Sequence, residues 1–266
     1  MVDAHHHLWD PARRDYPWMS GLTALQRPYT EADLRAAAGP EVAATVLVQT
    51  VSSAAETAEF LATATESDLV AGVVGWLDLT APDLAVPDGP LVGVRHQVED
   101  EPDPTWLLRP EVVRGLRRLA RAGLVYDLLV RAPQRPAALT VARQVPDLTF
   151  VLDHAGKPGI AVGEWQPWAS WIADVAQLPN VVCKLSGLVT EADWTGWTVT
   201  GIRPYAEHVL AAFGADRVMF GSDWPVCELA GGYAAVLGLT REVLAGATAT
   251  ERAAVLGDTA RRVYLG

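Results

Sequence analysis

The sequence has 266 residues, half of them hydrophobic, so it is long enough to bury the core of one large domain. It contains 21 Lys and Arg residues against 32 Asp and Glu residues, which gives a formal net charge of -11. Nucleic acids and anionic membranes recruit basic surfaces, so this charge argues against both as partners and leaves room for a small-molecule substrate.

Eight short apolar segments, rich in β-branched residues, predict β-strands. In chain order they are Val2–Leu8, Ala44–Gln49, Ala71–Leu77, Leu91–Gln97, Leu124–Val130, Thr149–Asp153, Val181–Ser186 and Arg217–Ser222. Each is hydrophobic along almost its whole length, as strands covered on both faces are. Amphipathic segments between them predict helices: one after the capping box of Ser53 and Glu56, one from Pro110 to Gly123, and Arg135–Gln144, Trp168–Ala176, Pro204–Phe213, Tyr233–Leu244 and Thr250–Val263.

Strands that alternate with helices indicate right-handed βαβ units and a parallel sheet. Eight such units in a chain of this length predict a (β/α)8 TIM barrel built by a single domain, residues 1–266. The main competitor, a doubly wound sheet, usually has a glycine-rich turn after its first strand, whereas this first strand ends in histidines. The long connection that follows, DPARRDYPWMSGLTALQRPYT, has a length that is often functional.

Two cysteines, Cys183 and Cys227, lie in apolar sequence without a CxxC spacing, so we expect reduced and buried thiols. No secretory signal is visible at the N-terminus, and no apolar run is long enough to cross a bilayer. We therefore expect a soluble cytoplasmic protein, either a monomer or a homodimer.

Polar residues recur where the predicted strands end, and in a barrel this edge carries the chemistry. They are His5, His6, His7, Arg95, His96, Asp127, His154, Lys184, Ser186 and Asp223. Because side chains alternate along a strand, His5 and His7 share one face and His6 points away. That pair could therefore meet His154 and Asp223 in a site of three histidines and one aspartate.

Neutral imidazole and carboxylate ligands suit Zn²⁺ and other borderline divalent ions. A bound ion would polarise a carbonyl group and acidify a water molecule, and Asp223 would accept the proton. The HxH pair alone, or an aspartate at one strand end alone, is a weak signal, since both also occur as structural residues. What favours a site is that five of the six histidines fall at predicted strand ends.

Arg95 and Lys184 allow two interpretations. They either form internal ion pairs, with Asp127 or Glu191 as partners, or they bind a carboxylate, hydroxyl or oxyanion of the substrate. Four of the ten tryptophans lie in or beside strand-end loops, where they could form an apolar wall around a substrate: Trp9, Trp18, Trp194 and Trp224.

Seven segments, in this order, resemble the amidohydrolase-related (amidohydrolase 2) TIM-barrel hydrolases, and above all their sugar-lactone branch: VDAHHHLWD, YPW, GVRHQVEDEPDPTWL, LVYDLLV, FVLDHAGKP, VVCKLSGLVTEADW and MFGSDWPVC. The resemblance implies that His5, His7 and His154 are the site histidines and that Asp223 is the base that activates water. Arg95, His96 and Lys184 fall where this branch places groups that face the substrate. Asp127, Trp9 and Trp224 complete the substrate-binding set that we expect.

The resemblance also implies a reaction, in which water opens a sugar lactone of the L-fucono or L-rhamnono type. The binuclear pattern of the superfamily is incomplete, because Arg95 and His96 replace a bridging lysine or glutamate on strand four and strand five has no histidine. We expect one divalent ion, zinc before others, and a metal-free mechanism with histidines as electrophiles stays open. Two alternatives are a metal-dependent decarboxylase of an aromatic or unsaturated acid on the same barrel, and a barrel that only binds or scaffolds.

Overall fold

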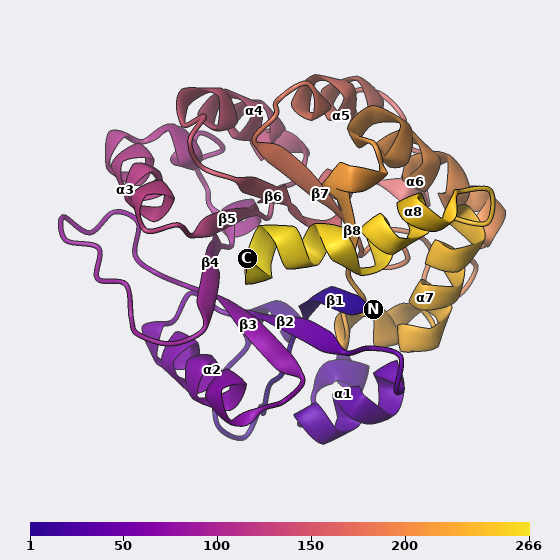
Figure 1. Ribbon diagram of the computed structural model, residues 1–266, viewed down its shortest axis with the longest axis horizontal. Helices are drawn as coiled ribbons and strands as arrows, with labels where there is room; N and C mark the ends of the chain where they lie inside the picture. Colours follow the sequence, from indigo (N-terminus) through magenta and orange to yellow (C-terminus); the bar gives the residue numbers. More distant parts are fainter.

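The structure, a computed structural model, describes residues 1–266 and contains one sheet of eight strands that pair in the order of the sequence. The strands are β1 (Val2–His6), β2 (Ala44–Val48), β3 (Val70–Gly75), β4 (Leu91–His96), β5 (Val125–Leu128), β6 (Phe150–Leu152), β7 (Val181–Leu185) and β8 (Val218–Phe220). Every neighbouring pair is parallel. The predicted (β/α)8 barrel is therefore confirmed (Figure 1), with strands that end one or two residues earlier than expected.

The barrel closes through the residues that follow β8. His6 pairs in parallel with Trp224. The backbone N–H of His7 donates to the Trp224 carbonyl at 2.7 Å, and the N–H of Asp223 donates to the His5 carbonyl at 2.8 Å. These bonds hold the histidine-rich end of β1 directly against Asp223, although the two lie at opposite ends of the chain.

Helices surround the barrel (Figure 1): α1 (Glu31–Ala38), α2 (Ala54–Glu66), α3 (Pro110–Arg121), α4 (Arg135–Gln144), α5 (Trp168–Ala176), α6 (Val199–Phe213), α7 (Gly232–Val243) and α8 (Ala249–Ala253). Helix α1, which begins at a capping box formed by Thr30 and Asp33, was not among the predicted helices. No helix joins β3 to β4. Three prolines in that connection, Pro82, Pro87 and Pro90, lack the backbone N–H that a helix interior needs.

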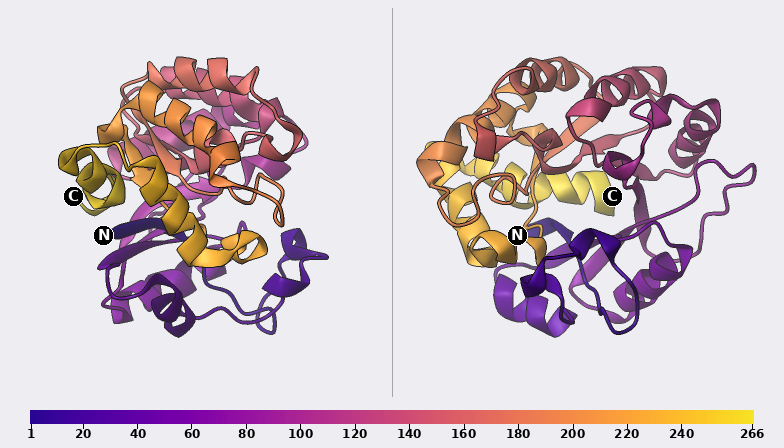
Figure 2. Two further views of the ribbon diagram at one scale, coloured as in Figure 1. Left: turned by 90° about the vertical axis from the view of Figure 1, so that its right-hand side faces the viewer. Right: turned by 180° about the vertical axis from the view of Figure 1, so that it is seen from behind.

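The C-terminal residues cover one end of the barrel. The helix that starts at α8 continues through π-helical turns to Leu265 and lies across the barrel (Figure 1), on the side opposite the connection after β1 (Figure 2). Its residues Ala260 and Tyr264 pack against strand valines in the cluster that fills the barrel interior. A site at the strand ends must therefore lie at the other end of the barrel.

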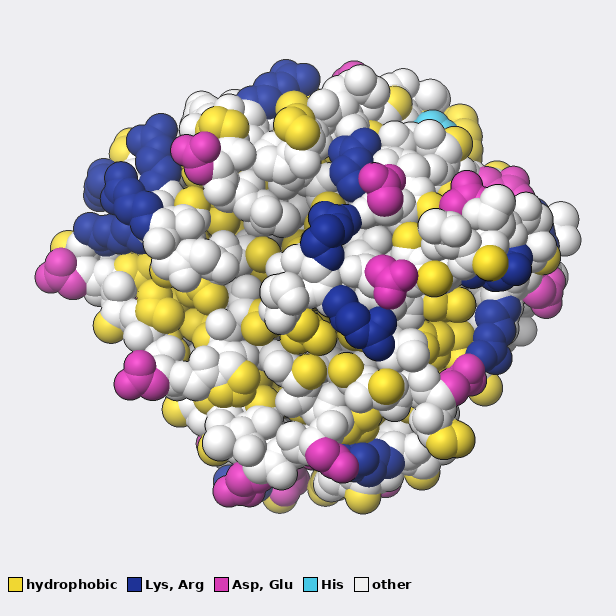
Figure 3. Space-filling view, viewed as in Figure 1, with side chains coloured by type: hydrophobic (Ala, Val, Ile, Leu, Met, Phe, Trp, Pro, Cys, Tyr) yellow, Lys and Arg dark blue, Asp and Glu magenta, His cyan; other side chains and the backbone are white.

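On the face covered by the C-terminal helix, charged side chains are interspersed with hydrophobic ones (Figure 3). Acidic and basic side chains are interspersed there, and basic ones gather over α3 (Figure 3), where Arg114, Arg117 and Arg121 are exposed. No helix has both the length and the apolar character that crossing a membrane requires.

Candidate active site

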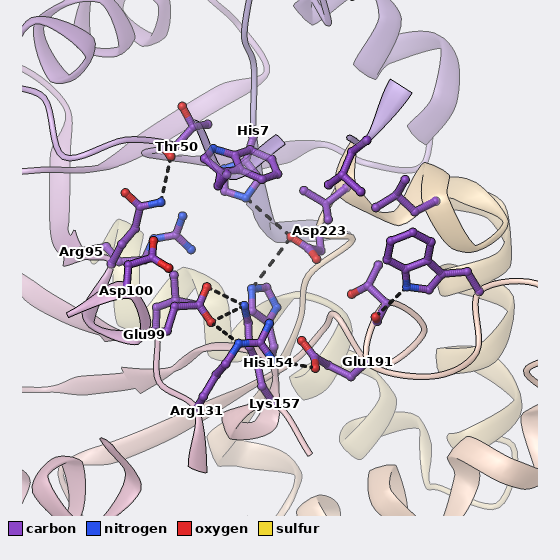
Figure 4. Close-up of a pocket in the computed structure, with 18 residues that line it drawn as sticks. His7, Thr50, Arg95, Glu99, Asp100, Arg131, His154, Lys157, Glu191 and Asp223 are labelled. Atoms are coloured by element: carbon purple, nitrogen blue, oxygen red, sulfur yellow. Dashed lines mark hydrogen bonds and ion pairs between the residues drawn. The ribbon is translucent and has the colours of Figure 1, made fainter. Parts of the chain in front are cut away.

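Three imidazole rings surround one carboxylate at the end of the barrel away from the C-terminal helix. His5 lies on β1 and His7 just after it, His154 follows β6, and Asp223 follows β8. The Oδ1 atom of Asp223 is 3.7 Å from His5 Nε2, 3.6 Å from His7 Nε2 and 3.9 Å from His154 Nε2. Figure 4 shows His7 and His154 directed toward Asp223 from two sides. The structure thus brings together all four residues that were predicted to form the site.

Hydrogen bonds at the far side of each ring orient two of the histidines. His7 Nδ1 lies 2.7 Å from the carbonyl oxygen of Val48, so Nδ1 carries the proton and the Nε2 lone pair points to Asp223. His154 Nδ1 bonds to the Ser186 hydroxyl at 2.9 Å. His6 is turned away, as its alternation along β1 predicts, and bonds to the Thr45 hydroxyl.

A network of buried charges lies beneath His5. Lys184 Nζ is 3.1 Å from His5 Nδ1, 3.0 Å from Asp153 Oδ1 and 2.5 Å from Asp127 Oδ2. Arg95 Nη1 donates to Asp153 Oδ2 at 2.9 Å and lies 3.3 Å from His5 Nε2. The network therefore contacts both nitrogens of the His5 ring. Asp153, which directly precedes His154, was not among the predicted site residues.

Lys184 and Asp127 do not reach the cavity, because both side chains are fully buried. Tyr264 from the C-terminal helix donates to both oxygens of Asp127, at 2.8 and 2.9 Å. Burial raises the pKa of Asp127 to about 6, against the opposing effect of the Lys184 charge. Of the two interpretations open to the sequence, the internal ion pair describes Lys184. Arg95 combines an ion pair with a place on the cavity wall.

His96 also lies outside the cavity. Its ring stacks on Trp106 with centroids 4.1 Å apart, its Nδ1 accepts a hydrogen bond from Trp76, and its Nε2 bonds to Glu101 at 2.7 Å. Both ring nitrogens are thus engaged by protein groups, which leaves none for a substrate. His96 instead holds the connection that follows β4.

The four tryptophans of the strand-end loops divide into two pairs. Trp9 and Trp224 are only 4% and 2% exposed, and each packs edge-on against Tyr29. Trp18 and Trp194 line the cavity. The cavity-lining tryptophans are therefore Trp18 and Trp194, and the other pair is buried against Tyr29.

A cavity of about 370 Å³ opens above Asp223, and its wall includes His7, His154 and Arg95. Its other hydrogen-bonding residues were not predicted to face a substrate; they are Thr50, Gln97, Glu99, Asp100, Arg131, Lys157, Thr190 and Glu191. They follow β2, β4, β5, β6 and β7 by one to six residues. All of them except Gln97 lie beyond the ends of the predicted strands, in the loops that follow.

Burial sets the protonation of the site. It lowers the pKa of His5 well below 6.5, helped by the Lys184 charge, and lowers the pKa of His154 to about 4. Burial alone would raise the pKa of Asp223, but the electrostatic influence of neighbouring groups, His154 first and Lys157 among them, lowers it below 3.8. Near neutral pH the rings of His5 and His154 are therefore neutral and the carboxylate of Asp223 is ionised.

The backbone is strained at two of the four residues. His154 and Asp223 have φ values of 51° and 56°, in the left-handed region that costs a non-glycine residue about 1 kcal/mol or more. Glycines allow close packing around them. A Cβ atom at Gly187 would lie 2.6 Å from His154 Nδ1, and one at Gly221 would lie 2.7 Å from His5 Cβ. At His154 and Asp223 the backbone therefore adopts an unfavourable conformation that places the two side chains in the site.

The donor set fits a divalent metal ion. His5, His7 and Asp223 form one group whose possible ligand atoms all lie within 4.8 Å of one another, and His5, Asp153 and His154 form a second. The Nε2 atoms of His5 and His7 are only 3.1 Å apart, and the hydrogen bond of His7 to Val48 leaves its Nε2 free for a ligand bond. Neutral imidazoles beside a carboxylate are the protonation states that metal binding requires.

Comparison with known proteins defines the class. The family model described as Amidohydrolase matches residues 2–265, and the chain belongs to this family of enzymes. It is 38% identical to L-fucono-1,5-lactonase of Burkholderia multivorans, over 99% of this chain and 95% of that protein. An L-rhamnono-gamma-lactonase of Scheffersomyces stipitis is 28% identical over 53% of this chain and 47% of its own length.

The fold matches solved structures over its whole length. An amidohydrolase from Burkholderia multivorans with bound zinc superposes with a TM-score of 0.93 at 38% identity, covering 99% of this chain and 98% of that chain. A 2,6-dihydroxybenzoate decarboxylase superposes with a TM-score of 0.61 at 14% identity. At that identity the second likeness shows the barrel fold alone, so it does not favour the decarboxylase alternative.

Proposed function

We propose that this enzyme hydrolyses sugar lactones and that its substrate is an aldonolactone of the L-fucono-1,5-lactone type. The observation that carries the proposal is the Asp223 carboxylate, which lies 3.6 to 3.9 Å from three imidazoles and lines a cavity rich in hydrogen-bonding side chains. A hydroxylated ring with an electrophilic carbonyl suits such a cavity. The lactonase relatives support the same substrate class.

In this proposal Asp223 is the general base. Its carboxylate takes a proton from water while the water oxygen bonds to the lactone carbonyl carbon. The electron pair of the C=O bond moves to the carbonyl oxygen, and the positive charge of Arg95 stabilises it. The intermediate then collapses, the bond between the carbonyl carbon and the ring oxygen breaks, and Asp223 returns its proton to the ring oxygen. The product is the open-chain hydroxy acid.

We further propose that His5, His7, His154 and Asp223 hold one Zn²⁺ ion. Bound there, zinc would polarise the lactone carbonyl and make water more acidic. Arg95 and Lys184 place two fixed positive charges against Asp153 and His5, which disfavours a second cation on that side. The guanidinium of Arg95 also provides positive charge at the carbonyl in a metal-free mechanism.

We also propose that the enzyme acts in carbohydrate metabolism within a reducing compartment such as the cytoplasm. Its two cysteines, Cys183 and Cys227, are unpaired and buried. Burial raises the pKa of both thiols, which keeps them protonated and unreactive.

The first test is hydrolysis of L-fucono-1,5-lactone and L-rhamnono-1,4-lactone, with metal content measured on the same preparation. We expect ring opening, about one zinc ion per chain, and a fall in kcat of about 100-fold or more for Asp223→Asn. Lactone hydrolysis that survives complete chelation would refute the zinc requirement and leave the lactonase proposal standing. A protein that opens no sugar lactone but releases CO₂ from hydroxybenzoates would refute the lactonase proposal.

A further inference from the structure

Four charged side chains form a continuous chain along one side of the cavity, apart from the residues that the proposed reaction uses. Lys157 Nζ lies 2.8 and 2.7 Å from the two oxygens of Glu99. Arg131 joins Glu99 to the next acid, with Nε 3.0 Å from Glu99 Oε2 and Nη1 3.2 Å from Glu191 Oε2. We call these four residues the ion-pair wall. They follow β4, β5, β6 and β7, so the wall links four successive loops at the mouth of the barrel.

The ion-pair wall is built into the cavity and is not a set of solvated surface charges. The side chains of Glu99, Lys157 and Glu191 are only 14%, 13% and 13% exposed, and all four residues line the cavity. Burial would raise the pKa of Glu99, but the charge and hydrogen bond of Lys157, together with the charge of Arg131, outweigh this effect and lower the pKa. Two positive and two negative charges cancel, so the wall is polar without net charge.

Two hydrogen-bonding groups of the ion-pair wall, which lines the cavity, have no partner within the protein. Glu191 engages Arg131 through Oε2 alone, which leaves Oε1 as an acceptor without a protein donor. Arg131 uses Nε and Nη1 in the wall and is half exposed, so its Nη2 remains a donor. Figure 4 shows Arg131, Lys157 and Glu191 grouped on one side of the cavity, across from Thr50 and His7.

A sugar ring carries neighbouring hydroxyl groups, and each of them both donates and accepts a hydrogen bond. Adjacent N–H and carboxylate groups on one surface match such a pair of hydroxyls. Because the charges of the wall already neutralise one another, binding a neutral polyol does not require a buried charge to lose its partner. Trp18 and Trp194, also on the cavity wall, offer apolar surface to the ring.

We propose that the ion-pair wall recognises the ring hydroxyls of the substrate and makes the enzyme selective for neutral, polyhydroxylated lactones over lactones without hydroxyls. This inference rests on the proposed lactonase function, and it concerns selectivity, since Asp223 and Arg95 perform the ring opening. Glu191 is the most informative residue of the wall to replace, because it forms only one ion pair, with Arg131.

The experiment compares kcat/KM for L-fucono-1,5-lactone and for δ-valerolactone, the same ring without hydroxyls, in wild type, Glu191→Gln and Glu99→Gln. The matched control is Glu207→Gln on α6, an exposed residue that pairs with Arg203 and does not line the cavity. We expect kcat/KM for the sugar lactone to fall roughly 10- to 100-fold in both wall variants, since a buried hydrogen bond to a charged group is lost. We expect δ-valerolactone hydrolysis to stay within about threefold, and Glu207→Gln to change neither rate.

A binding measurement separates recognition from folding and from chemistry. 1,5-Anhydro-L-fucitol has the ring and its hydroxyls but no carbonyl, and its binding should change the tryptophan fluorescence of Trp18 and Trp194. Glu191→Gln should weaken this binding by the factor seen in kcat/KM while its melting temperature stays near that of wild type.

Equal losses for both lactones, or no loss for either, would overturn the inference and leave the lactonase proposal intact. The inference would also be overturned, with the lactonase proposal intact, if the wild-type enzyme opened δ-valerolactone as efficiently as the sugar lactone. A wild-type enzyme that opens neither lactone would instead refute the lactonase proposal itself, and the inference with it.

Discussion

Replacing Lys184 by methionine tests the buried charge network beneath the site. Lys184 Nζ lies 2.5 Å from Asp127 and 3.0 Å from Asp153, and all three side chains are 0% exposed. Methionine is unbranched and similar in length, so it fills much the same space and the main change is the loss of the positive charge. Removing one partner from a buried ion pair destabilises a protein by about 3 to 5 kcal/mol, because the other charge stays buried and unpaired.

The assay is urea unfolding followed by tryptophan fluorescence on wild type, Lys184→Met, Asp127→Asn and the double variant, all with chelator present. A loss of this size would lower the melting temperature by on the order of 10 °C. The double variant should recover part of the stability, with a coupling energy of about 2 kcal/mol, because Asp127→Asn removes one of the unpaired carboxylates. Arg203→Met on the exposed face of α6 is the control and should lose less than about 1 kcal/mol.

Two results would refute this reasoning. If Lys184→Met were as stable as Arg203→Met, the positive charge would not be needed to compensate Asp127 and Asp153. If the effects of Lys184→Met and Asp127→Asn simply added, the two residues would not be the energetic pair that their 2.5 Å contact indicates.

We predict that His7→Gln lowers the zinc content measured by elemental analysis. The control is His6→Gln, which should leave the zinc content unchanged because the His6 ring is bonded to Thr45. Equal losses of zinc in both variants would contradict the assignment of His7 as a ligand. Gly187→Ala should lower kcat about 10-fold or more, because the new Cβ would lie 2.6 Å from His154 Nδ1 and small displacements of catalytic groups are costly; unchanged kinetics would show that His154 is free to move. Lys157 and Arg131 together lower the pKa of Glu99 below 4.5 despite burial. The ion pairs of Glu99 therefore stabilise the fold above pH 4.5, and this stabilisation is lost as the pH falls through the lowered pKa. The stability difference between wild type and Glu99→Gln should therefore be larger at pH 7 than at pH 3.5 in urea titrations, and a difference independent of pH would rule out this ionisation as its source.

The barrel could be predicted from the sequence because its information is local. A strand covered on both faces must be hydrophobic throughout, and eight such segments alternate with amphipathic ones in this chain. Parallel strands in a barrel end at one common edge, so residues at their ends are neighbours in space whatever their separation in the chain. This is why His5, His7, His154 and Asp223 could be grouped before their coordinates were known. Alternation along β1 also placed His6 on the opposite face.

What the sequence could not determine is how far each polar side chain lies from solvent and which partner it meets. Lys184 and His96 sit on strands at the expected edge, yet one is buried against Asp127 and the other is held by Trp76 and Glu101. Their partners come from other strands and loops, and nothing in the local pattern encodes those contacts.

The ion-pair wall shows the same limit. Its four residues lie in loops, where no periodicity predicts side-chain direction, and they meet only because the barrel brings four loops to one rim. The sequence by itself therefore predicted the fold and grouped the residues that we propose react, since both predictions follow from strand periodicity and strand order. Only the tertiary structure decided which charges are buried to hold that centre and which remain open to a substrate, because burial depends on packing between segments far apart in the chain.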